Sequence, residues 1–507
     1  LSLIPEPIAR NHNIVAFKKT DTALEVAMLD TEDLTAIDFI KKKVGLKILP
    51  RLTDIESMKS TILQYQKSLK AEFGDLIQKD VGSIKSIPTE KEAELGTEDL
   101  KKLADDVPVI RIVDTLLKHA ILQNASDIHI EPQENELLVR YRIDGLLHDA
   151  MILPKNVGAS IAARIKVLSS LKLDEKRLPQ DGRFKIDMNG EKVSFRVSTL
   201  PTYYGEKIVM RLLRENVSGF TLESLGFHGE GLDTIHKAVK STTGMILTTG
   251  PTGSGKTTTL YTVLDILNTP DVNISTIEDP IEYQMKRVNQ TQVRPEIGFT
   301  FASGLRTLVR QDPDIIMVGE IRDNETASLA INASLTGHVV VATLHTNSAA
   351  GAIPRLIDMK VEPFLIVSTV NIIIAQRLIR RLSEQKEKYF LTKAELDTIG
   401  KSVNLDKVLR ALRDEKIVGK SDGWDKIPFW RLKKGVSPDD GFSGRIGIHE
   451  IMKVTPVIKE IILKSGTSDA IQKQAEADGM LTMIEDGIFK AVQGVTTIEE
   501  VLRVISE

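Results

Sequence analysis

The sequence predicts an α/β fold organised around a phosphate-binding loop, and three observations support this prediction. The apolar run 245–249 stops at a glycine-rich turn, after which residues 260–267 resume with helical spacing. The turn fits the pattern G-x-x-x-x-G-K-[ST] of a P-loop. Further apolar runs follow at 273–277, 315–318 and 339–344, and the run 315–318 is typical of a buried parallel strand.

The residue types in the glycine-rich turn suit phosphate binding. Its glycines let the backbone aim N–H groups at phosphate oxygens, and the following helix offers its positive N-terminus to the same anion. Lys256 can neutralise the β- and γ-phosphates, and Thr257 can hold Mg²⁺. An ordinary glycine-rich turn is the alternative, but a chance match arises in only about one or two per cent of chains this long. The residues expected to contact phosphate are Gly250, Pro251, Thr252, Gly253, Ser254, Gly255, Lys256, Thr257 and Thr258.

The composition limits domain number, chemistry and compartment. A chain of 507 residues allows about three domains, and its 41% apolar and 27% charged residues are ordinary for a globular protein. The net charge of −3 gives no general indication of nucleic-acid or membrane binding. The absence of cysteine excludes disulfides, thiolate catalysis and cysteine-based zinc sites. The first residues show no signal-peptide pattern, and the most apolar window, 363–375, is too short to span a bilayer, so we expect a cytosolic protein.

Residues 1–72 have the pattern of a small α/β module without a catalytic cluster. Strands are expected at 13–17 and 23–29, followed by a helix over 30–44. We interpret this module as a docking or regulatory domain, and a purely structural role is the alternative.

Residues 73–106 are polar and charged without a sustained apolar period, which predicts a flexible linker.

Residues 107–218 predict a second α/β module. Residues 110–121 have a helical pattern, and Asp144-Gly145 is a two-residue hairpin signal between two strands. A second signal of this kind, Asn189-Gly190, separates strands at 184–188 and 191–198.

The second hairpin would place two arginines directly opposite each other. With a two-residue turn at 189–190, Arg183 faces Arg196 on one face of the sheet, where like charges repel. Either both side chains reach into solvent or pair with separate carboxylates, or they share an anion. We favour the shared anion.

Between residues 219 and 382, acidic residues follow two of the expected strands. The stretch 278–282 ends the strand at 273–277, where ligands bind in open α/β sheets. Glu320 comes just beyond the run 315–318, placed to help bind Mg²⁺ or to polarise the attacking water.

A histidine lies at each end of the apolar run 339–344. His338 precedes it and His345 follows it. Two histidines that bracket a strand beside a P-loop favour phosphate sensing.

The remaining chain is divided into two parts. An insertion at 383–444 has helical periods, and the part at 445–507 is expected to be mostly helical, with Thr497 able to cap the last helix.

Eight motifs together resemble one family, the secretion and pilus-assembly ATPases of the GspE/PilB type. They are GPTGSGKT, TIEDPIEY, VGEIRD, TGHVVVATLHTNSA, SDIHIEP, RLPQDGRF, FRVSTLPT and GRIGIHE. The resemblance covers nearly the whole chain. It implies a RecA-like P-loop NTPase domain over 219–507, preceded by a PAS-like α/β domain over 107–218 and the small N-terminal module. It also implies a homohexamer that uses ATP and Mg²⁺, with Gly319 in an atypical Walker B motif.

The resemblance also assigns roles to side chains. Glu320 is the expected water activator, with Glu282 as the alternative. His338 and His345 would report the γ-phosphate, and Arg183 and Arg196 would reach the bound nucleotide, within one chain or across a subunit boundary.

Two departures from the family pattern matter. The family commonly carries zinc-binding cysteines after the sequence QRL, whereas residues 376–378 here lead into a cysteine-free insertion, so no zinc is expected and the insertion should fold by packing alone. Relatives that bind cyclic di-GMP carry a further repeat ahead of the IPEPIARNHNIV-like stretch, with which this chain begins, so such control is not expected.

We therefore expect an ATP-hydrolysing motor for type IV pilus or type II secretion pseudopilus assembly. It would act at the cytoplasmic face of the inner membrane, held there peripherally by a membrane platform protein. Residues 1–72 favour assembly over retraction. A nucleic-acid-translocating motor is the alternative, disfavoured because only 5% of residues are aromatic and the net charge is negative. A nucleotide-gated scaffold without turnover is disfavoured by intact Lys256 and Glu320.

Overall fold

The computed structural model describes residues 97–188, 191–214, 219–436 and 441–506, and a broken set of residues between 4 and 61. The chain divides into two compact units, which are described separately. One comprises Leu1–Met188 and Ser194–Leu212, and the other comprises Asn189–Val193 and Leu213–Glu507. Most of the helix predicted over 30–44 and the Asn189-Gly190 turn lie outside the described residues.

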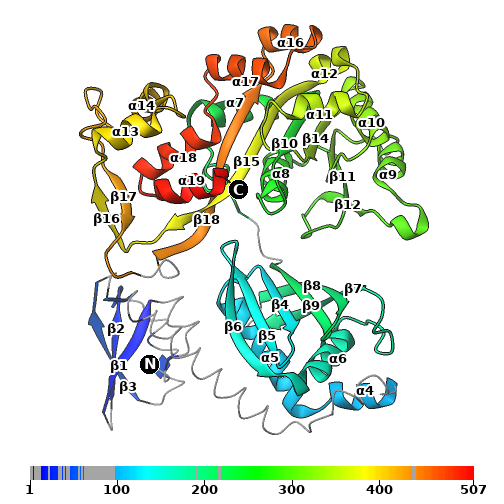
Figure 1. Cartoon of the computed structure of the whole chain (residues 1–507), viewed down its shortest axis with the longest axis vertical. Coiled ribbons are helices and arrows are strands. Elements are labelled where there is room, and N and C mark those ends of the chain that lie inside the picture. Colours follow the sequence, from blue (N-terminus) through cyan, green and yellow to red (C-terminus); the bar gives the residue numbers. More distant parts are fainter. Residues whose placement is uncertain are drawn as a thin grey trace. The chain divides into compact units, whose positions relative to one another are not determined.

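The N-terminal module contains a three-stranded sheet in the order β1-β2-β3 (Figure 1). Strands β1 (Ile14–Lys19) and β2 (Ala23–Met28) are antiparallel and confirm the two predicted strands. Strand β3 (Lys47–Leu52) was not predicted and pairs with β2 in parallel. Its Pro50 cannot donate a ladder hydrogen bond, which is tolerated because β3 is an edge strand.

The second module contains a six-stranded sheet in the order β6-β5-β4-β9-β8-β7. Its strands are β4 (Asp127–Pro132), β5 (Glu136–Ile143), β6 (Leu146–Pro154), β7 (Gln180–Met188), β8 (Glu191–Thr202) and β9 (Gly205–Arg214). Its helices are α4 (Thr97–Ala104), α5 (Val107–Leu122) and α6 (Gly158–Leu168). Helix α5 confirms the predicted helix. Helix α4 lies inside the predicted linker and buries Leu100 and Ala104, so the linker prediction is wrong for these residues.

The first predicted hairpin is confirmed. Ile143 pairs with Leu146 across the two-residue turn, and Asp144 and Gly145 have φ angles of 48° and 93°. Positive φ at both central positions is what a turn matching the twist of the two strands requires.

The contacts between β7 and β8 agree with the register predicted for the second hairpin. The rings of Phe184 and Phe195 stack with centroids 4.8 Å apart, and Thr199 donates a hydrogen bond to the Gln180 carbonyl over 3.4 Å. Both pairs are opposed in that register. Because successive side chains alternate between faces, Arg183 and Arg196 lie on the other face of these strands, where both are exposed.

The C-terminal unit is built on a seven-stranded sheet in the order β12-β11-β13-β14-β10-β15-β18. The strands are β10 (Gly244–Thr249), β11 (Ile274–Glu278), β12 (Val288–Gln292), β13 (Ile315–Val318), β14 (Val339–Leu344), β15 (Val370–Leu382) and β18 (Phe442–Lys453). All neighbours are parallel except β15 and β18. The part from 445 is mostly helical, as predicted, but it begins within strand β18, which was not predicted and pairs with β15 along nearly its whole length.

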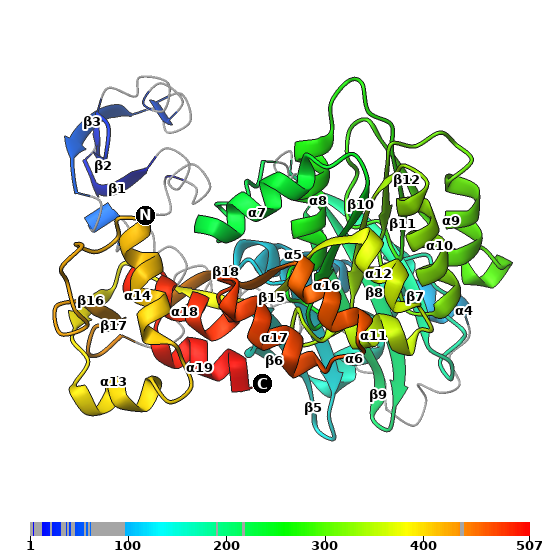
Figure 2. The same ribbon diagram turned by 90° about the horizontal axis from the view of Figure 1, so that it is seen from above.

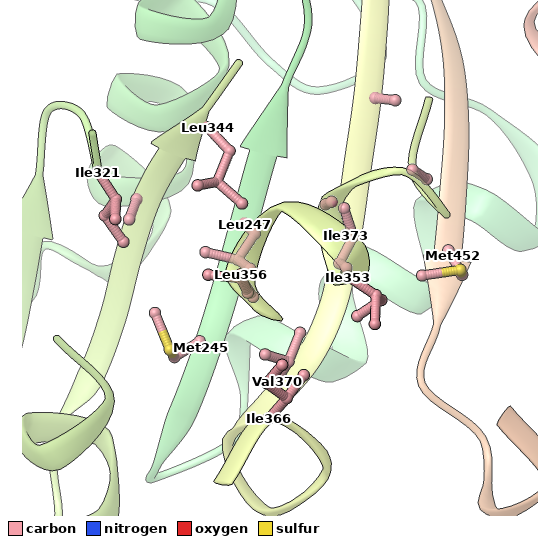
Figure 3. Close-up of a cluster of buried hydrophobic side chains, with 14 of the residues drawn as sticks. Met245, Leu247, Ile321, Leu344, Ile353, Leu356, Ile366, Val370, Ile373 and Met452 are labelled. Carbon is pink, nitrogen blue, oxygen red and sulfur yellow. The ribbon is translucent and has the colours of Figure 1, made fainter. Parts of the chain in front are cut away.

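Helices cover both faces of this sheet (Figures 1 and 2). Ile246 of β10 packs in a cluster with α7 (Gly229–Val239) and α8 (Lys256–Leu267). Met245 and Leu247 point to the other face and pack near Leu356 and Ile366 (Figure 3). The helices that contribute to this second cluster are α9 (Phe301–Leu308), α10 (Asn324–Leu335), α11 (Ala352–Asp358), α12 (Pro363–Thr369), α16 (Pro456–Leu463), α17 (Ser468–Ala477), α18 (Met483–Val492) and α19 (Ile498–Ser506).

The insertion folds onto the C-terminal helices. It contains β16 (Lys386–Tyr389), α13 (Lys393–Ile399), α14 (Leu405–Asp414) and β17 (Phe429–Leu432). Its apolar cluster includes Leu412 and Phe429 and continues into Phe489 of α18. Packing is not its only support, contrary to expectation, because Lys407 pairs with Glu485 at 2.7 Å. Within the described residues, no helix combines the length and apolar character needed to cross a membrane.

Candidate nucleotide-binding site

The P-loop connects β10 to α8, as the sequence predicted. Strand β10 ends at Thr249 and α8 begins at Lys256. Gly250 has φ +145° and Gly255 has φ +89°, a backbone region that L side chains rarely adopt. A Cβ on Gly250 would also lie 2.4 Å from the Gln376 carbonyl oxygen, so both the fold of the loop and its close packing require glycine there.

Lys256 lies across the loop. Its ammonium group donates hydrogen bonds to the carbonyls of Gly250 at 2.7 Å and Pro251 at 3.0 Å. Burial lowers the pKa of Lys256, while the negative charge of Glu320 acts in the opposite direction. A phosphate anion in the loop would favour the charged form further, because an opposite charge stabilises an ammonium group.

Glu320 follows β13 and is held by two partners. Its carboxylate lies 2.6 Å from a guanidinium nitrogen of Arg322 and 2.8 Å from Nε2 of His345. These residues meet because β13 and β14 are parallel neighbours, so their carboxyl ends lie at the same edge of the sheet. The residue before it, Gly319, has little room for a side chain: a Cβ would lie 3.2 Å from the Ile277 carbonyl oxygen.

The two predicted histidines lie at opposite ends of β14. His345 is at the carboxyl end. The next residue, Thr346, donates its backbone N–H to Thr249 Oγ1 over 2.7 Å, so the loop after β14 is hydrogen-bonded to the end of β10. His338 is at the amino end and lies 2.8 Å from the Ala333 carbonyl oxygen. At about 3.3 Å per residue, the strand separates them by roughly 20 Å. The structure therefore brings His345, but not His338, to the P-loop of this chain.

The surroundings of His345 favour its neutral imidazole form. Burial lowers its pKa, and the nearby positive charge of Lys256 lowers it further, against the opposing effect of Glu320. A neutral ring can donate through one nitrogen and accept through the other.

The acidic stretch after β11 lies at the same sheet edge as Glu320. Strand β11 runs parallel to β13, with Ile277 opposite Val318. Glu282 is half-buried, and its backbone N–H lies 3.4 Å from the Tyr261 hydroxyl. Both predicted carboxylates thus follow adjacent strands.

Sequence reasoning gave no separate role to the first residue of this stretch, Glu278, whose carboxyl group is buried. Glu278 accepts hydrogen bonds from Tyr261, from Thr276 at 2.5 Å and from Gln290 at 3.1 Å. Burial raises its pKa. A second residue that it missed is Gln376 of β15, which contacts the P-loop directly. Both strands carry other polar residues, so the sequence alone gave no signal that would single these two out.

The residues present suit a magnesium ion held together with a nucleotide. No group of three His, Cys, Asp or Glu that could hold a metal occurs in the described part of the chain. Magnesium in nucleotide sites is usually held by one or two protein oxygens, by waters and by the substrate phosphates. The Thr257 hydroxyl at the start of α8 and the Glu320 carboxylate supply oxygens of this kind.

Comparisons with known proteins identify the family of this chain. A family model described as "Type II/IV secretion system protein" matches residues 102–503, and a model of the MshEN domain matches residues 1–72. The chain belongs to the type II/IV secretion system protein family.

Members of this family are similar along almost the whole chain. The chain is 40% identical over 503 residues to a type IV pilus assembly ATPase PilB of Myxococcus xanthus, covering 99% of this chain and 86% of that protein. It is 42% identical over 496 residues to a type II secretion system protein E of Xanthomonas campestris, covering 96% and 82%.

Solved structures of secretion and pilus motors share the fold. The pilus retraction motor PilT with bound ADP is 26% identical, with a TM-score of 0.51, covering 78% of this chain and 96% of that one. The ATPase DotB of Legionella pneumophila, at 21% identity and a TM-score of 0.56, covers 78% and 95% and agrees in fold. The α/β fold with a RecA-like ATPase domain is therefore confirmed.

Proposed function

We propose that this chain is a hexameric ATPase that powers assembly of a type IV pilus or of a type II secretion pseudopilus. The observation that carries the proposal is the P-loop with Glu320 and His345 at the same sheet edge, in a chain whose relatives are named pilus assembly ATPases and secretion system proteins. ATPase activity follows from this family membership.

Each residue at the sheet edge has a distinct task in this proposal. Lys256 leaves the carbonyls of its own loop and neutralises the β- and γ-phosphates. Glu320 orients the attacking water, with Glu282 as the alternative. His345 contacts the γ-phosphate or the water and thereby distinguishes ATP from ADP. A bound Mg²⁺, held through Thr257 and Glu320, would neutralise charge on the phosphates during transfer.

We further propose that Arg183 and Arg196 assist hydrolysis from the second module. Both guanidinium groups are exposed on one face of the β7–β8 hairpin, and guanidinium groups bind phosphate oxygens in a fixed geometry. The supplying subunit is either the same chain or a neighbour in the ring. Attachment to the inner membrane would be peripheral, through a membrane platform protein.

A direct experiment tests the motor function. The purified chain should hydrolyse ATP in the presence of Mg²⁺, and its rate should not rise when DNA is added. In the source bacterium, deletion of the gene should abolish either surface pili or release of secreted proteins, and only a copy with intact Lys256 should restore it. Hydrolysis that depends on DNA, with both processes intact in the deletion strain, would instead favour the nucleic-acid motor.

A further inference from the structure

Gln376 lies directly beside the P-loop. Strands β10 and β15 are parallel, and Thr249, the last residue of β10, is opposite Ala375. Gln376 is one residue further along β15, level with the start of the loop. Its side chain is polar but only 2% exposed, in a strand whose neighbouring residues are mostly apolar. A buried amide of this kind is stable only when its polar atoms have partners.

The amide of Gln376 has a partner on each side. Its Nε2 donates a hydrogen bond to the backbone carbonyl of Ser254 over 2.6 Å. Its Oε1 accepts a hydrogen bond from the hydroxyl of Thr259 over 2.8 Å. Ser254 belongs to the loop and Thr259 to the first turn of α8, so one side chain links loop, helix and sheet.

The loop backbone also packs closely against Gln376. A Cβ on Gly250 would lie 2.4 Å from the Gln376 backbone oxygen, and a Cβ on Gly255 would lie 3.1 Å from its Nε2. The glycines that open and close the loop thus leave space for the same residue.

We propose that Gln376 is a positioning residue that holds the P-loop backbone in its phosphate-binding shape. The inference rests on the proposed nucleotide site. The carbonyl of Ser254 and the N–H of Gly255 belong to one planar peptide unit and point in opposite directions. The hydrogen bond from Gln376 to that carbonyl therefore fixes where the N–H of Gly255 points. Several backbone N–H groups of the loop must point at one anion at the same time. A peptide group that is already held in the right orientation loses less conformational entropy when the nucleotide binds, so binding is tighter.

The same strand offers a matched control at its other end. The side-chain amide of Asn371 donates a hydrogen bond to the Thr243 carbonyl over 3.0 Å, just before β10 begins. A Cβ on Gly244 would lie 2.4 Å from its Nδ2. Asn371 thus makes the same kind of contact with β10, but far from the P-loop.

The test compares Gln376→Met with Asn371→Leu. Nucleotide affinity is measured by titration with ATP and Mg²⁺, and the unfolding temperature is measured with and without ADP. Gln376→Met removes both bonds, and we expect it to weaken ATP binding by about tenfold, the upper effect of losing the one ordinary hydrogen bond that it makes to the loop backbone. The rise in unfolding temperature on adding ADP should shrink accordingly. Asn371→Leu should bind ATP and respond to ADP as the wild type does, even if it unfolds at a lower temperature.

Three results would overturn the proposal. Wild-type affinity in a folded Gln376→Met variant would show that the loop keeps its shape without the amide. Equal weakening in both variants would show that Gln376 acts only through general stability. If Gln376→Met does not fold, Thr259→Val replaces it, because it removes the bond that holds the Gln376 amide in the orientation that reaches the Ser254 carbonyl, with little change in shape. We expect a severalfold loss of affinity, and unchanged affinity would again overturn the proposal.

A parallel measurement keeps the two hypotheses apart. Unchanged ATP binding and turnover in Lys256→Ala would overturn the nucleotide site itself. Lost turnover in Lys256→Ala together with unchanged affinity in Gln376→Met would overturn only the role of Gln376.

Discussion

His345 and Glu320 are in contact, with Nε2 of the histidine 2.8 Å from Oε1 of the carboxylate, although they follow different strands. The contact places an imidazole whose pKa is lowered by burial against the carboxylate that is expected to act on water. Arg322 binds the other carboxylate oxygen at 2.6 Å. Glu320 therefore has both oxygens engaged, and its orientation beside the P-loop is fixed by neighbouring side chains.

Glu320→Gln should separate ATP binding from hydrolysis. The amide has nearly the same shape but is a poor base, so we expect ATP affinity to stay close to wild type and hydrolysis to slow by roughly 10²–10⁴-fold. Titration with ATP and a single-turnover assay measure the two effects. If ATP affinity collapses in this variant, and Glu282→Gln is the one that binds without turnover, the roles of the two carboxylates are exchanged.

Lys256→Ala should remove nearly all ATP hydrolysis while the fold remains. Loss of a preorganised charge at the phosphates is expected to slow hydrolysis by roughly a hundredfold or more. Among the described residues, the side chain hydrogen-bonds only to carbonyls of its own loop, so the free energy of unfolding should change by less than about 1 kcal/mol. Steady-state turnover and thermal unfolding check this, and near-wild-type turnover would contradict the site.

Arg183→Ala and Arg196→Ala should each slow hydrolysis strongly. Each change also removes one of two like charges on facing strands, so the unfolding temperature without nucleotide should rise slightly. Mixing Arg183→Ala protomers with Lys256→Ala protomers tests which subunit supplies the arginine. Activity above that of either parent would mean that the arginine acts across a subunit boundary. No recovery in normally assembled mixtures would place its action within the protomer, and full activity in both arginine variants would exclude the role.

Stability should fall as the pH rises through about 9. Burial disfavours the charged form of His228, but its hydrogen bonds to Asp486 at 2.6 Å and Glu415 at 2.7 Å outweigh this and raise its pKa to about 9. A histidine with a raised folded pKa contributes fully below its unfolded pKa, near 6.5, and loses its contribution as the pH passes the folded value. At about 1.4 kcal/mol per pKa unit, the loss is roughly 3 kcal/mol.

Denaturant unfolding between pH 6 and 10 measures this loss. The pKa of Lys490, which also contacts Asp486, is lowered by burial, so this group acts in the opposite direction at high pH. The difference between the wild type and His228→Gln isolates the histidine. If the free energy of unfolding changes with pH in the same way in both proteins, His228 is not charged in the folded state.

Chelation should stop hydrolysis without unfolding the protein. The insertion contains no cysteine and is held by an apolar cluster and by ion pairs such as Lys407–Glu485. EDTA should therefore leave the unfolding temperature without nucleotide unchanged, while ATP turnover falls to background and returns with Mg²⁺. A drop in unfolding temperature that zinc restores and Mg²⁺ does not would reveal a structural metal.

Several features could be predicted from the sequence because the information is local. The P-loop is a contiguous motif, and its glycines and Lys256 adopt the expected strand–loop–helix arrangement. The strand at Ile315–Val318 and the turn at Asp144-Gly145 agree with the residues expected. In each case a few neighbouring residues determine the backbone, through turn chemistry or apolar periodicity.

Only the tertiary structure decided which of the expected residues meet. Strand direction separates His338 from His345, although both flank the same strand. Strand β18 lies in the sheet because its residues pair with β15, about 70 positions earlier in the chain, and local patterns do not encode such pairing. Gln376 reaches Ser254 for the same reason: the parallel pairing of β10 with β15 brings together residues that are distant in sequence, and only then do their hydrogen-bonding groups satisfy one another.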